Sequence, residues 1–282
     1  MHHKAQRFDP RQDMHGDKFE IFHYHDIGTR HLDAHYHDFY EVFCFIEGEV
    51  DYWVEGSLYH LKPGDILLIN PTELHKPVPR NDSSNYERIV LWVNKAYLSA
   101  MAPELEECFN PLLPTYKKIL RPSALQINEL LRLLIEFVDE FHGNGFGKEH
   151  SSYGLLLQAL VMLNRISLGS NVSTEKYTTN TLISDVIAYI SEHYNEELTL
   201  DGISKHFFVS KYHLSHEFSR AVGTSIHRYI TLKRLNNAHD MLLEGVSPGQ
   251  VSIACGFGDY TNFFRAFKAE YGISPRVCFE GN

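Results

Sequence analysis

The stretch GQVSIACGFGDYTNFFRAFKAEYGISP (249–275) decides how the C-terminal part of this chain folds. A short helical segment is followed by a tight turn and a second helix, whose Asp259 can cap its first turn and whose Gly272 can end it. Phe263 and Phe267 lie one helical turn apart, so they give the second helix one buried face. The pattern is typical of a helix-turn-helix unit, in which the second helix enters the major groove of DNA.

The same pattern occurs a second time further upstream. Leu214, Phe218 and Gly223 repeat the spacing of the two phenylalanines and Gly272 at an offset of 49 residues. The helices predicted for this region are 184–194, 199–207, 210–223, 227–245, 249–256 and 259–272. The long helix joins the two units, and a rigid connector of this kind can hold two recognition helices about one turn of DNA, roughly 34 Å, apart.

The motifs of this region together resemble the arabinose-regulator (AraC/XylS) family of bacterial transcription regulators. They are TL-x-x-I-S (199–204), S-x-x-x-L-x-x-x-F (210–218), G-x-S (223–225), Y-I-x-x-x-R (229–234), VSIACGF (251–257), D-x-x-x-F-x-R-x-F-K (259–268) and G-I-S-P (272–275). The first turn departs from the family pattern at Phe208, where Gly or Asn is usual. A positive φ there costs about 1 kcal/mol.

The resemblance and the helical periodicity together predict which side chains face DNA. They are Lys211, Tyr212, Ser215 and His216 on the first recognition helix, and Tyr260, Thr261, Asn262 and Arg265 on the second. Arg265 can bind guanine through two hydrogen bonds, and Asn262 can bind adenine in the same way. A solvated helix face is the alternative for each position. His216 and Ser219 stand where the family often has basic residues.

Residues 18–98 are predicted to form an antiparallel, cupin-like β-barrel. EVFCFIEGEVDYWVEGSLYHL (41–61) contains two strand-like runs separated at Gly48, and in the second run alternate residues are apolar. Glycines and prolines recur at the short intervals that are typical of barrels and sandwiches. The helices predicted at 125–141 and 152–168 form a hairpin with surplus apolar surface, which serves either dimerisation or packing against the barrel.

Two segments, HYHDFYEVFCFIEG (35–48) and PGDILLINPTELH (63–75), resemble the signatures of cupin barrels. His35 and His37 share a strand face, Glu41 keeps that face in the absence of a bulge, and His75 comes from a neighbouring strand. These four side chains can hold Mn, Fe, Ni or Zn, or they can bind effector hydroxyls without metal, which is the role we favour. The predicted effector-binding residues are His35, His37, Tyr40, Glu41, Trp53, His75 and Trp92. Core packing is the alternative for the aromatic ones.

The 282 residues therefore divide into two domains of an α+β multidomain protein. We predict an effector-binding and dimerisation domain at 1–168, with the barrel at about 18–98 and the helices at about 123–168. The small, polar segment 169–180 is a predicted linker, and 181–282 is a predicted all-α DNA-binding domain with two helix-turn-helix units.

The net charge of −10 counts against a nucleic-acid binder at face value. Residues 1–179, however, carry 17 basic and 25 acidic groups, whereas residues 180–282 carry 9 and 11. The negative charge therefore belongs mainly to the predicted effector domain. The chain has no apolar run of about 18 residues and no C-x-x-C pair, so a cytoplasmic protein without membrane contact and with reduced thiols is expected.

The sequence predicts a ligand-responsive transcription regulator that is not an enzyme. Its predicted partners are double-stranded DNA, a small carbohydrate-like effector and a second copy of the chain, and the resemblance adds RNA polymerase, which activators of the family contact. The alternative is a metal-dependent cupin enzyme or a metal sensor fused to a DNA-binding domain. No cofactor is required by this prediction, and a divalent transition metal in the barrel is the one candidate.

Overall fold

The fold is described from a computed structural model, which covers residues 5–6, 8–9, 11–27, 34–71, 73–81, 85–169 and 181–280. The chain forms two compact units, Met1–Tyr177 and Thr178–Asn282. The predicted linker at 169–180 lies outside the described residues, except for Gly169, which ends a helix.

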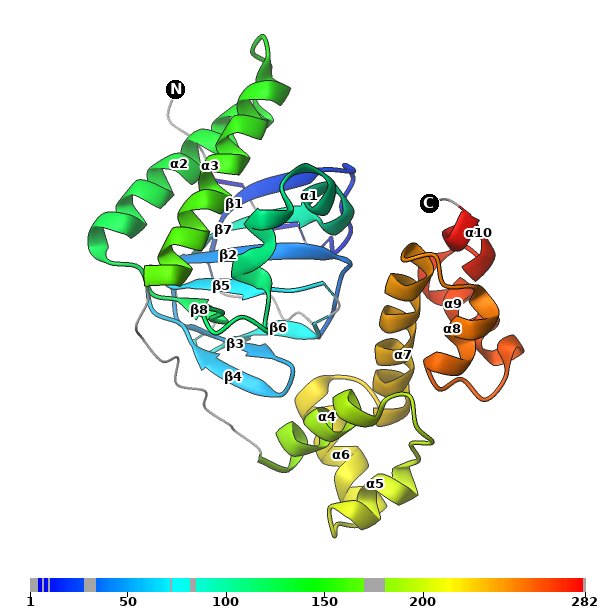
Figure 1. Ribbon diagram of the computed structural model, residues 1–282. Coiled ribbons are helices and arrows are strands. Elements are labelled where there is room, and N and C mark those ends of the chain that lie inside the picture. Colours follow the sequence, from blue (N-terminus) through cyan, green and yellow to red (C-terminus); the bar gives the residue numbers. More distant parts are fainter. Residues whose placement is uncertain are drawn as a thin grey trace. The chain divides into compact units, whose positions relative to one another are not determined.

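The first unit consists of antiparallel strands followed by a helical hairpin (Figure 1). Its described elements are β1 (Phe19–Ile27), β2 (Phe39–Glu47), β3 (Val50–Val54), β4 (Ser57–His60), β5 (Ile66–Ile69), β6 (His75–Pro79), β7 (Asn85–Asn94), α1 (Lys95–Met101), the 3-10 helix η1 (Pro103–Phe109), β8 (Ile119–Leu120), α2 (Ala124–His142) and α3 (Lys148–Gly169). The sequence did not predict α1 and η1, which follow β7 directly.

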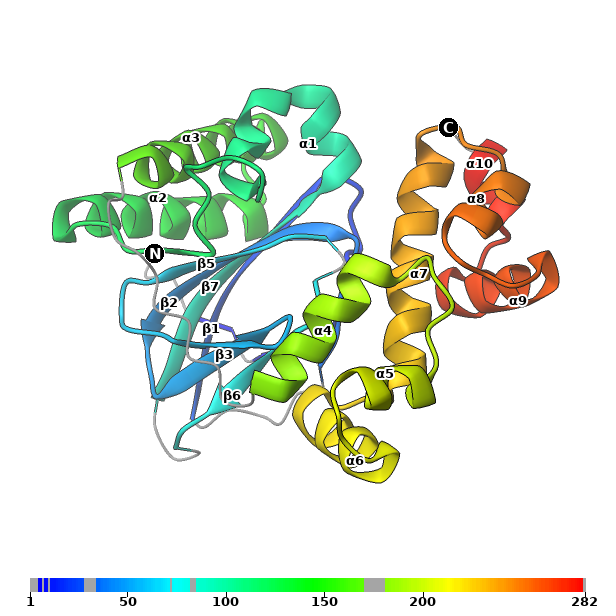
Figure 2. The ribbon, with the colours of Figure 1, turned by 60° about the horizontal axis from the view of Figure 1, so that its bottom comes forward.

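The described strands pair into two sheets. One has the order β1-β7-β2-β5-β8 and the other the order β4-β3-β6, and every pairing within them is antiparallel. Figure 2 shows the two sheets facing each other, with α2 and α3 on the outer side of the larger sheet. The antiparallel sheet domain is therefore confirmed, whereas closure into a barrel is not shown by these pairings and stays a prediction.

The larger sheet separates two apolar cores. Phe39 and Phe43 of β2 pack between the two sheets, whereas Val42 and Cys44 point the other way, toward α2 and α3. Because both faces of the strand are covered, β2 is buried over nearly its whole length. The hairpin α2–α3 uses its apolar face, which includes Phe137, against this sheet. Packing against the sheet, one of the two roles predicted for the hairpin, is therefore confirmed.

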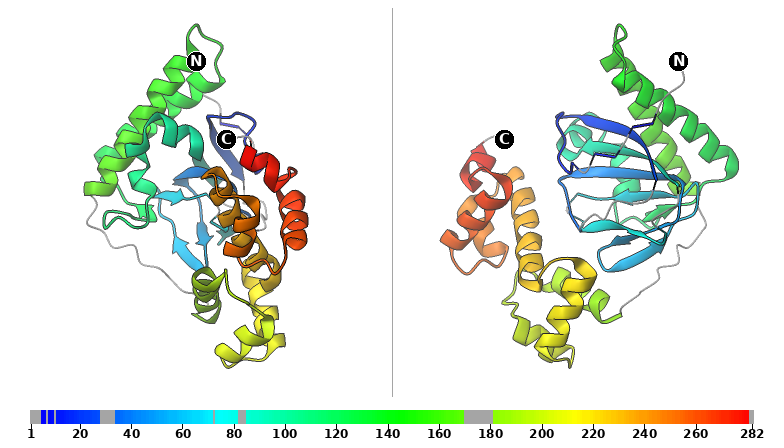
Figure 3. Two further views of the ribbon diagram at one scale, coloured as in Figure 1. Left: turned by 45° about the vertical axis from the view of Figure 1, so that its right-hand side comes forward. Right: turned by 180° about the vertical axis from the view of Figure 1, so that it is seen from behind.

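The second unit is helical, as predicted. Its described elements are α4 (Thr181–His193), α5 (Leu200–His206), α6 (Lys211–Val222), α7 (Ile226–Leu243), α8 (Pro248–Ala254), α9 (Tyr260–Tyr271) and α10 (Pro275–Glu280). The helix α7 connects the group α4–α6 with the group α8–α10, as Figures 1 and 3 show. The sequence did not predict α10, which packs against α7, α8 and α9.

The start and end signals read from the sequence lie where the helices begin and end. The side chains of Ser210 and Asp259 accept hydrogen bonds from backbone N–H groups in the first turns of α6 and α9. Gly223 and Gly272 follow these helices with φ of 84° and 71°, a left-handed conformation that residues with a Cβ rarely adopt. No helix within the described residues has the length and apolar character to cross a membrane.

Candidate nucleic-acid interface and ligand site

The first recognition helix, α6, presents the side chains that the periodicity predicts. Leu214 and Phe218 are fully buried, while Lys211, Tyr212 and His216 are exposed and Ser215 is half-buried. The exposed side forms a surface hollow that is lined by Tyr212, Ser215, His216, Ser219 and Arg220. The sequence analysis missed Arg220, which is the last basic residue on this face.

The cations beside α6 are already engaged by acidic groups. The carboxylate of Asp201 on α5 binds the ammonium groups of Lys205 at 2.6 Å and Lys211 at 2.7 Å. Hydrogen bonds from these two lysines lower the pKa of Asp201 to about 2. Arg220 is paired with Glu217 at 2.5 Å. This surface therefore offers DNA fewer free cations than its composition suggests.

The second recognition helix, α9, presents Tyr260, Thr261, Asn262 and Arg265 to solvent and buries Phe263 and Phe267. Asp259 accepts a hydrogen bond from the Asn262 amide Nδ2 at 2.6 Å, and Arg265 donates to the Asn262 Oδ1 at 2.8 Å. The two side chains suited to base recognition are thus already aligned along one face. All the positions predicted to face outward on α9 do so.

The two turns of the repeat carry different residues at the position that has a positive φ. Phe208 in the first helix-turn-helix unit has a φ of 54°, and its side chain is 95% exposed. The positive φ considered for this position from the sequence is therefore present. Gly256 occupies the corresponding place in the second helix-turn-helix unit, with a φ of 74°. A Cβ added at Gly256 would lie 2.5 Å from the backbone oxygen of Asn195, which belongs to the loop between α4 and α5. Only glycine fits this close approach.

The same loop is also held by the connecting helix. Arg234 on α7 donates from Nε to the carbonyl oxygen of Tyr194 and from Nη2 to that of Glu196, both at 2.7 Å. The loop 194–196 therefore lies between Arg234 and the turn at Gly256. These contacts, which we call the 194–196 clasp, join the first helix-turn-helix unit to the second.

The first unit of the chain contains a small cavity between the two sheets. It encloses about 40 Å³, enough for roughly three water molecules. It is lined by Phe8, Arg11, Gln12, Tyr24, His35, Glu41, Phe43, Tyr52, Pro77, Tyr86, Arg88, Val90 and Trp92. The lining combines phenylalanine, tyrosine and tryptophan rings with charged, amide and imidazole side chains, a mixture that suits a small polar molecule.

Two arginines that the sequence analysis missed belong to this cavity. Arg88 is 3% exposed, binds Asp26 at 2.6 Å and lies 4.2 Å from the ring centroid of Tyr86. Arg11 binds Glu20 at 2.6 Å, and its Nη1 has no hydrogen-bond partner among the described residues although it is buried. Strand alternation was the available signal for Arg88, because it shares a face of the run YERIVLWVN (86–94) with Trp92.

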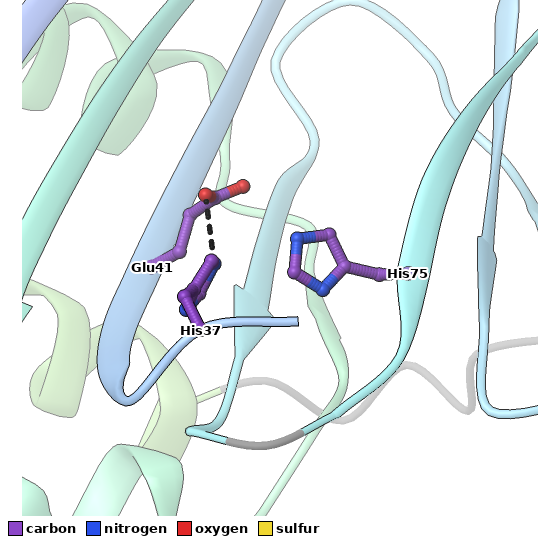
Figure 4. Close-up of side chains that lie close together, drawn as sticks. All are labelled: His37, Glu41 and His75. Atoms are coloured by element: carbon purple, nitrogen blue, oxygen red, sulfur yellow. Dashed lines mark hydrogen bonds and ion pairs between the residues drawn. The ribbon is translucent and has the colours of Figure 1, made fainter. Parts of the chain in front are cut away.

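Beside the cavity, His37, Glu41 and His75 gather into one buried cluster (Figure 4). One ligand atom from each lies within 4.8 Å of the others. His37 Nε2 is 3.3 Å from Glu41 Oε2, which also accepts a hydrogen bond from Trp92 Nε1 at 2.8 Å. The loop before β2, β2 itself and the start of β6 supply the three residues, as the two cupin-like segments predict.

Burial affects the ionisation of this cluster in two ways. Burial opposes ionisation of Glu41, but the side chain of His37, followed by those of His35 and Trp92, holds its pKa below the usual value. Burial also lowers the pKa of His75 well below its usual value, and the imidazoles of His35 and His37 add to this effect. A carboxylate therefore faces an uncharged imidazole across the cluster.

The other predicted effector residues are placed differently. The ring centroid of His35 lies 4.4 Å from that of His75, and His35 lines the cavity without belonging to the three-residue cluster. Tyr40 lies on the opposite face of β2, where its ring packs 4.4 Å from that of Phe109. Trp53 is likewise not part of the cavity lining, because it alternates with Tyr52 on β3. Tyr40 and Trp53 therefore do not line this cavity, and their role in effector binding stays a prediction.

Two protein families match this chain in the order of its two units. The AraC-like ligand binding domain matches residues 18–163, which is more than half of the chain, and a helix-turn-helix domain matches residues 203–280. The chain belongs to the AraC family of transcription regulators. As a member of this family it is a ligand-responsive, DNA-binding regulator, and the matches do not support the alternative of a metal-dependent enzyme.

Relatives of this AraC-family regulator match over most of its length. The HTH-type transcriptional activator RhaS of Escherichia coli O81 (strain ED1a) is 25% identical over 255 residues, which are 88% of this chain and 87% of the relative. The same-named protein of Escherichia coli O127:H6 (strain E2348/69 / EPEC) is 24% identical over the same length.

Solved structures that match this chain include ToxT from Vibrio cholerae, with a TM-score of 0.36, 14% identity and coverage of 93% of this chain and 98% of that one. The C-terminal domain of AraT from Geobacillus stearothermophilus has a TM-score of 0.36 and 23% identity, and covers 38% of this chain and 89% of that one.

Proposed function

We propose that this regulator reads double-stranded DNA with the exposed faces of α6 and α9, under the control of a small, carbohydrate-like effector held between the sheets of its first unit. The observation that carries the proposal is the repeat itself. Both helices bury a pair of apolar residues at the same spacing and leave the same side exposed. One connecting helix, α7, and the 194–196 clasp join the two units.

Of the two helices, α9 is the better equipped for direct recognition of bases. Its Arg265 and Asn262 are hydrogen-bonded to each other, so part of the side-chain entropy that DNA binding would cost is already lost. Arginine suits guanine and asparagine suits adenine in the major groove. The face of α6, with Tyr212, Ser215 and His216, is expected to add hydrogen bonds and apolar contacts.

The cavity supports a polar effector with hydroxyl groups. Glu41 offers an acceptor, the buried Nη1 of Arg11 offers a donor, and Trp92 and Tyr24 offer ring faces for the C–H surface of a sugar. Because the cavity encloses only about 40 Å³, binding requires side chains of the lining to move apart. Such a movement gives the effector different affinities for two arrangements of the protein, which regulation requires.

Activation of transcription, a contact with RNA polymerase and homodimerisation complete the proposal. Both relatives described above are activators by name. The ion pairs beside α6 leave few cations for phosphate contacts, so two recognition helices in each of two chains would supply the affinity that one helix lacks. Light scattering of the full chain tests the dimer, and a monomer at micromolar concentration would contradict it.

The DNA-reading role is tested with alanine variants and a selected operator. The full chain is used to select binding sequences from a random pool, and Arg265→Ala and His216→Ala are compared with wild type on the selected DNA. Loss of a base contact is expected to weaken binding by about 1–3 kcal/mol and to relax sequence preference at one position. Arg276→Ala serves as the control, because Arg276 is exposed on α10 and paired with Glu280. Unchanged affinity and preference in both test variants would overturn the assignment.

The effector class is tested by thermal unfolding of the full chain in the presence of a compound library. A sugar that binds the native state raises the melting temperature, and Glu41→Gln is expected to reduce that shift. A shift caused only by compounds without hydroxyl groups would contradict the carbohydrate class and leave the DNA-reading role untouched.

A further inference from the structure

The hydrogen bonds of His37 and His75 determine which ring nitrogen of each carries a proton. His37 Nδ1 lies 2.9 Å from the carbonyl oxygen of Phe39, and His75 Nδ1 lies 2.7 Å from that of Glu73. A carbonyl oxygen only accepts, so each Nδ1 must be the protonated donor. In the uncharged ring the Nε2 atom then carries a lone pair. In that uncharged form both Nε2 atoms are acceptors.

These acceptors converge on a further acceptor. His37 Nε2 lies 3.3 Å from Glu41 Oε2, and that oxygen already receives the hydrogen bond from Trp92. His75 is 0% exposed, and its Nε2 has no hydrogen-bond partner among the described residues. Acceptors that face one another in a buried site repel, and an unpartnered buried nitrogen loses its hydration without compensation. A cation is the group that would satisfy all of them.

A proton on His37 would satisfy only part of this arrangement. It would convert the contact with Glu41 into an ion pair, but His75 Nε2 would still lack a partner. A metal ion satisfies both nitrogens and the carboxylate together. Two ligand atoms that bind one such ion at about 2.1 Å are at most about 4.2 Å apart, so atoms within 4.8 Å of one another need only a small closure.

We propose that His37 Nε2, His75 Nε2 and the Glu41 carboxylate bind one divalent first-row transition-metal ion. The carbonyl oxygens of Phe39 and Glu73 orient the two rings through their Nδ1 atoms, which is the usual outer-shell arrangement of histidine ligands. Two imidazoles and one carboxylate suit zinc, iron, nickel or manganese. Because Glu41 also lines the cavity, a water or an effector oxygen held there would be an additional ligand.

This inference goes beyond the proposed function, since DNA reading by α6 and α9 does not depend on it. The test uses the full chain after removal of bound metal with a chelator. Co²⁺ is added as the probe, and its visible absorption is followed together with displacement by Zn²⁺. One equivalent of Co²⁺ per chain is expected to bind tightly, and the bound form is expected to unfold at a higher temperature.

The variants are chosen to keep the fold. Glu41→Gln retains an oxygen that can accept from Trp92, and His75→Gln retains a polar side chain of similar length. Each is expected to bind Co²⁺ at least about tenfold more weakly than wild type. His23→Gln is the matched control, because His23 forms a separate histidine–glutamate pair with Glu87 at 2.7 Å in the same sheet. This variant is expected to bind Co²⁺ as wild type does.

Two results would overturn the proposal. One is a wild-type chain that takes up no equivalent of Co²⁺ or Zn²⁺, and the other is wild-type affinity in both test variants, which would assign the binding to other histidines. X-ray absorption of the wild-type zinc complex gives a readout that needs no variant. Two imidazole nitrogens with oxygen donors are expected, and sulfur ligands or four imidazoles would contradict the assignment.

Discussion

Substitution of Gly256 by alanine tests whether the 194–196 clasp stabilises the helical domain. Glycine at this turn has φ of 74°, and a residue with a Cβ in this conformation costs about 1–2 kcal/mol. The new Cβ would lie 2.5 Å from the oxygen, 2.7 Å from the carbonyl carbon and 2.8 Å from the Cα of Asn195. These are backbone atoms, so the loop itself must move.

The loop cannot move without disturbing the bonds of Arg234, which hold it on its other side at 2.7 Å. Overpacking of this kind costs about 1–3 kcal/mol, and the smaller entropy of alanine in the unfolded chain returns up to about 1 kcal/mol. Gly256→Ala is therefore expected to lower the free energy of unfolding of the helical domain by about 2–4 kcal/mol.

Urea unfolding with two optical probes measures this change domain by domain. Both tryptophans of the chain, Trp53 and Trp92, lie in the sheet domain, so their fluorescence follows that domain alone, whereas far-UV circular dichroism also follows the helical domain. The dichroism transition is expected to move to lower urea while the fluorescence transition stays in place.

The control for this experiment is the same substitution at Gly249 on α8. A Cβ there meets no atom within 4 Å, so Gly249→Ala is expected to be neutral or stabilising by up to about 1 kcal/mol. Gly256→Ala with a free energy of unfolding within about 0.5 kcal/mol of wild type would refute the reasoning. So would an equal shift in both probes.

Other predictions concern the same domain. Phe208→Gly is expected to raise the free energy of unfolding of this domain, measured in urea, by up to about 1 kcal/mol. The substitution relieves the strained φ of 54°, and the 95% exposed ring makes little contact. A lower free energy of unfolding would contradict this. Arg234→Ala is expected to lower the free energy of unfolding of the helical domain by about 1–3 kcal/mol. Arg234→Lys is expected to be nearly as unstable as Arg234→Ala, because an ammonium group cannot reach both carbonyl oxygens. Wild-type stability in Arg234→Lys would argue against the two-bond contact. Burial raises the pKa of Cys255 to about 11. The buried thiol therefore makes its full contribution to the free energy of unfolding below about pH 9, where the thiol of the unfolded chain begins to ionise. This contribution is lost as the pH rises toward 11. In the native chain at pH 8 the four buried cysteines are expected to react slowly with a disulfide reagent, and rates as fast as those in urea would contradict their burial.

The helical domain was the more predictable part of the fold. Its signals are local, because apolar residues at helical spacing, a capping side chain such as Ser210 and a glycine such as Gly223 act within a few residues of each other. The inward and outward faces of α6 and α9 followed directly. The helix α10 was missed because it is only six residues long, although Ser274 caps its first turn and Pro275 occupies its first position.

The antiparallel architecture of the sheet domain was predictable from the sequence, whereas the residues that line its cavity were less so. Both faces of β2 are buried, so the hydrophobic pattern could not tell which of the neighbours Tyr40 and Glu41 faces the cavity. Arg11 and Arg88 belong to the lining because Glu20 and Asp26, at other places in the sheet, balance their charges. Such pairings depend on strand register and chain crossing, which one sequence does not specify. The gathering of His37, Glu41 and His75 followed from the two cupin-like segments.

The 194–196 clasp means that the two helix-turn-helix units are not interchangeable modules. In the sequence, the loop at Asn195 directly precedes the first helix-turn-helix unit, yet it lies against Gly256 of the second helix-turn-helix unit. A hybrid protein that took one unit from a different regulator would need a matching glycine, loop and arginine at the junction. Although the units repeat the same pattern, they are expected to exchange only as a pair.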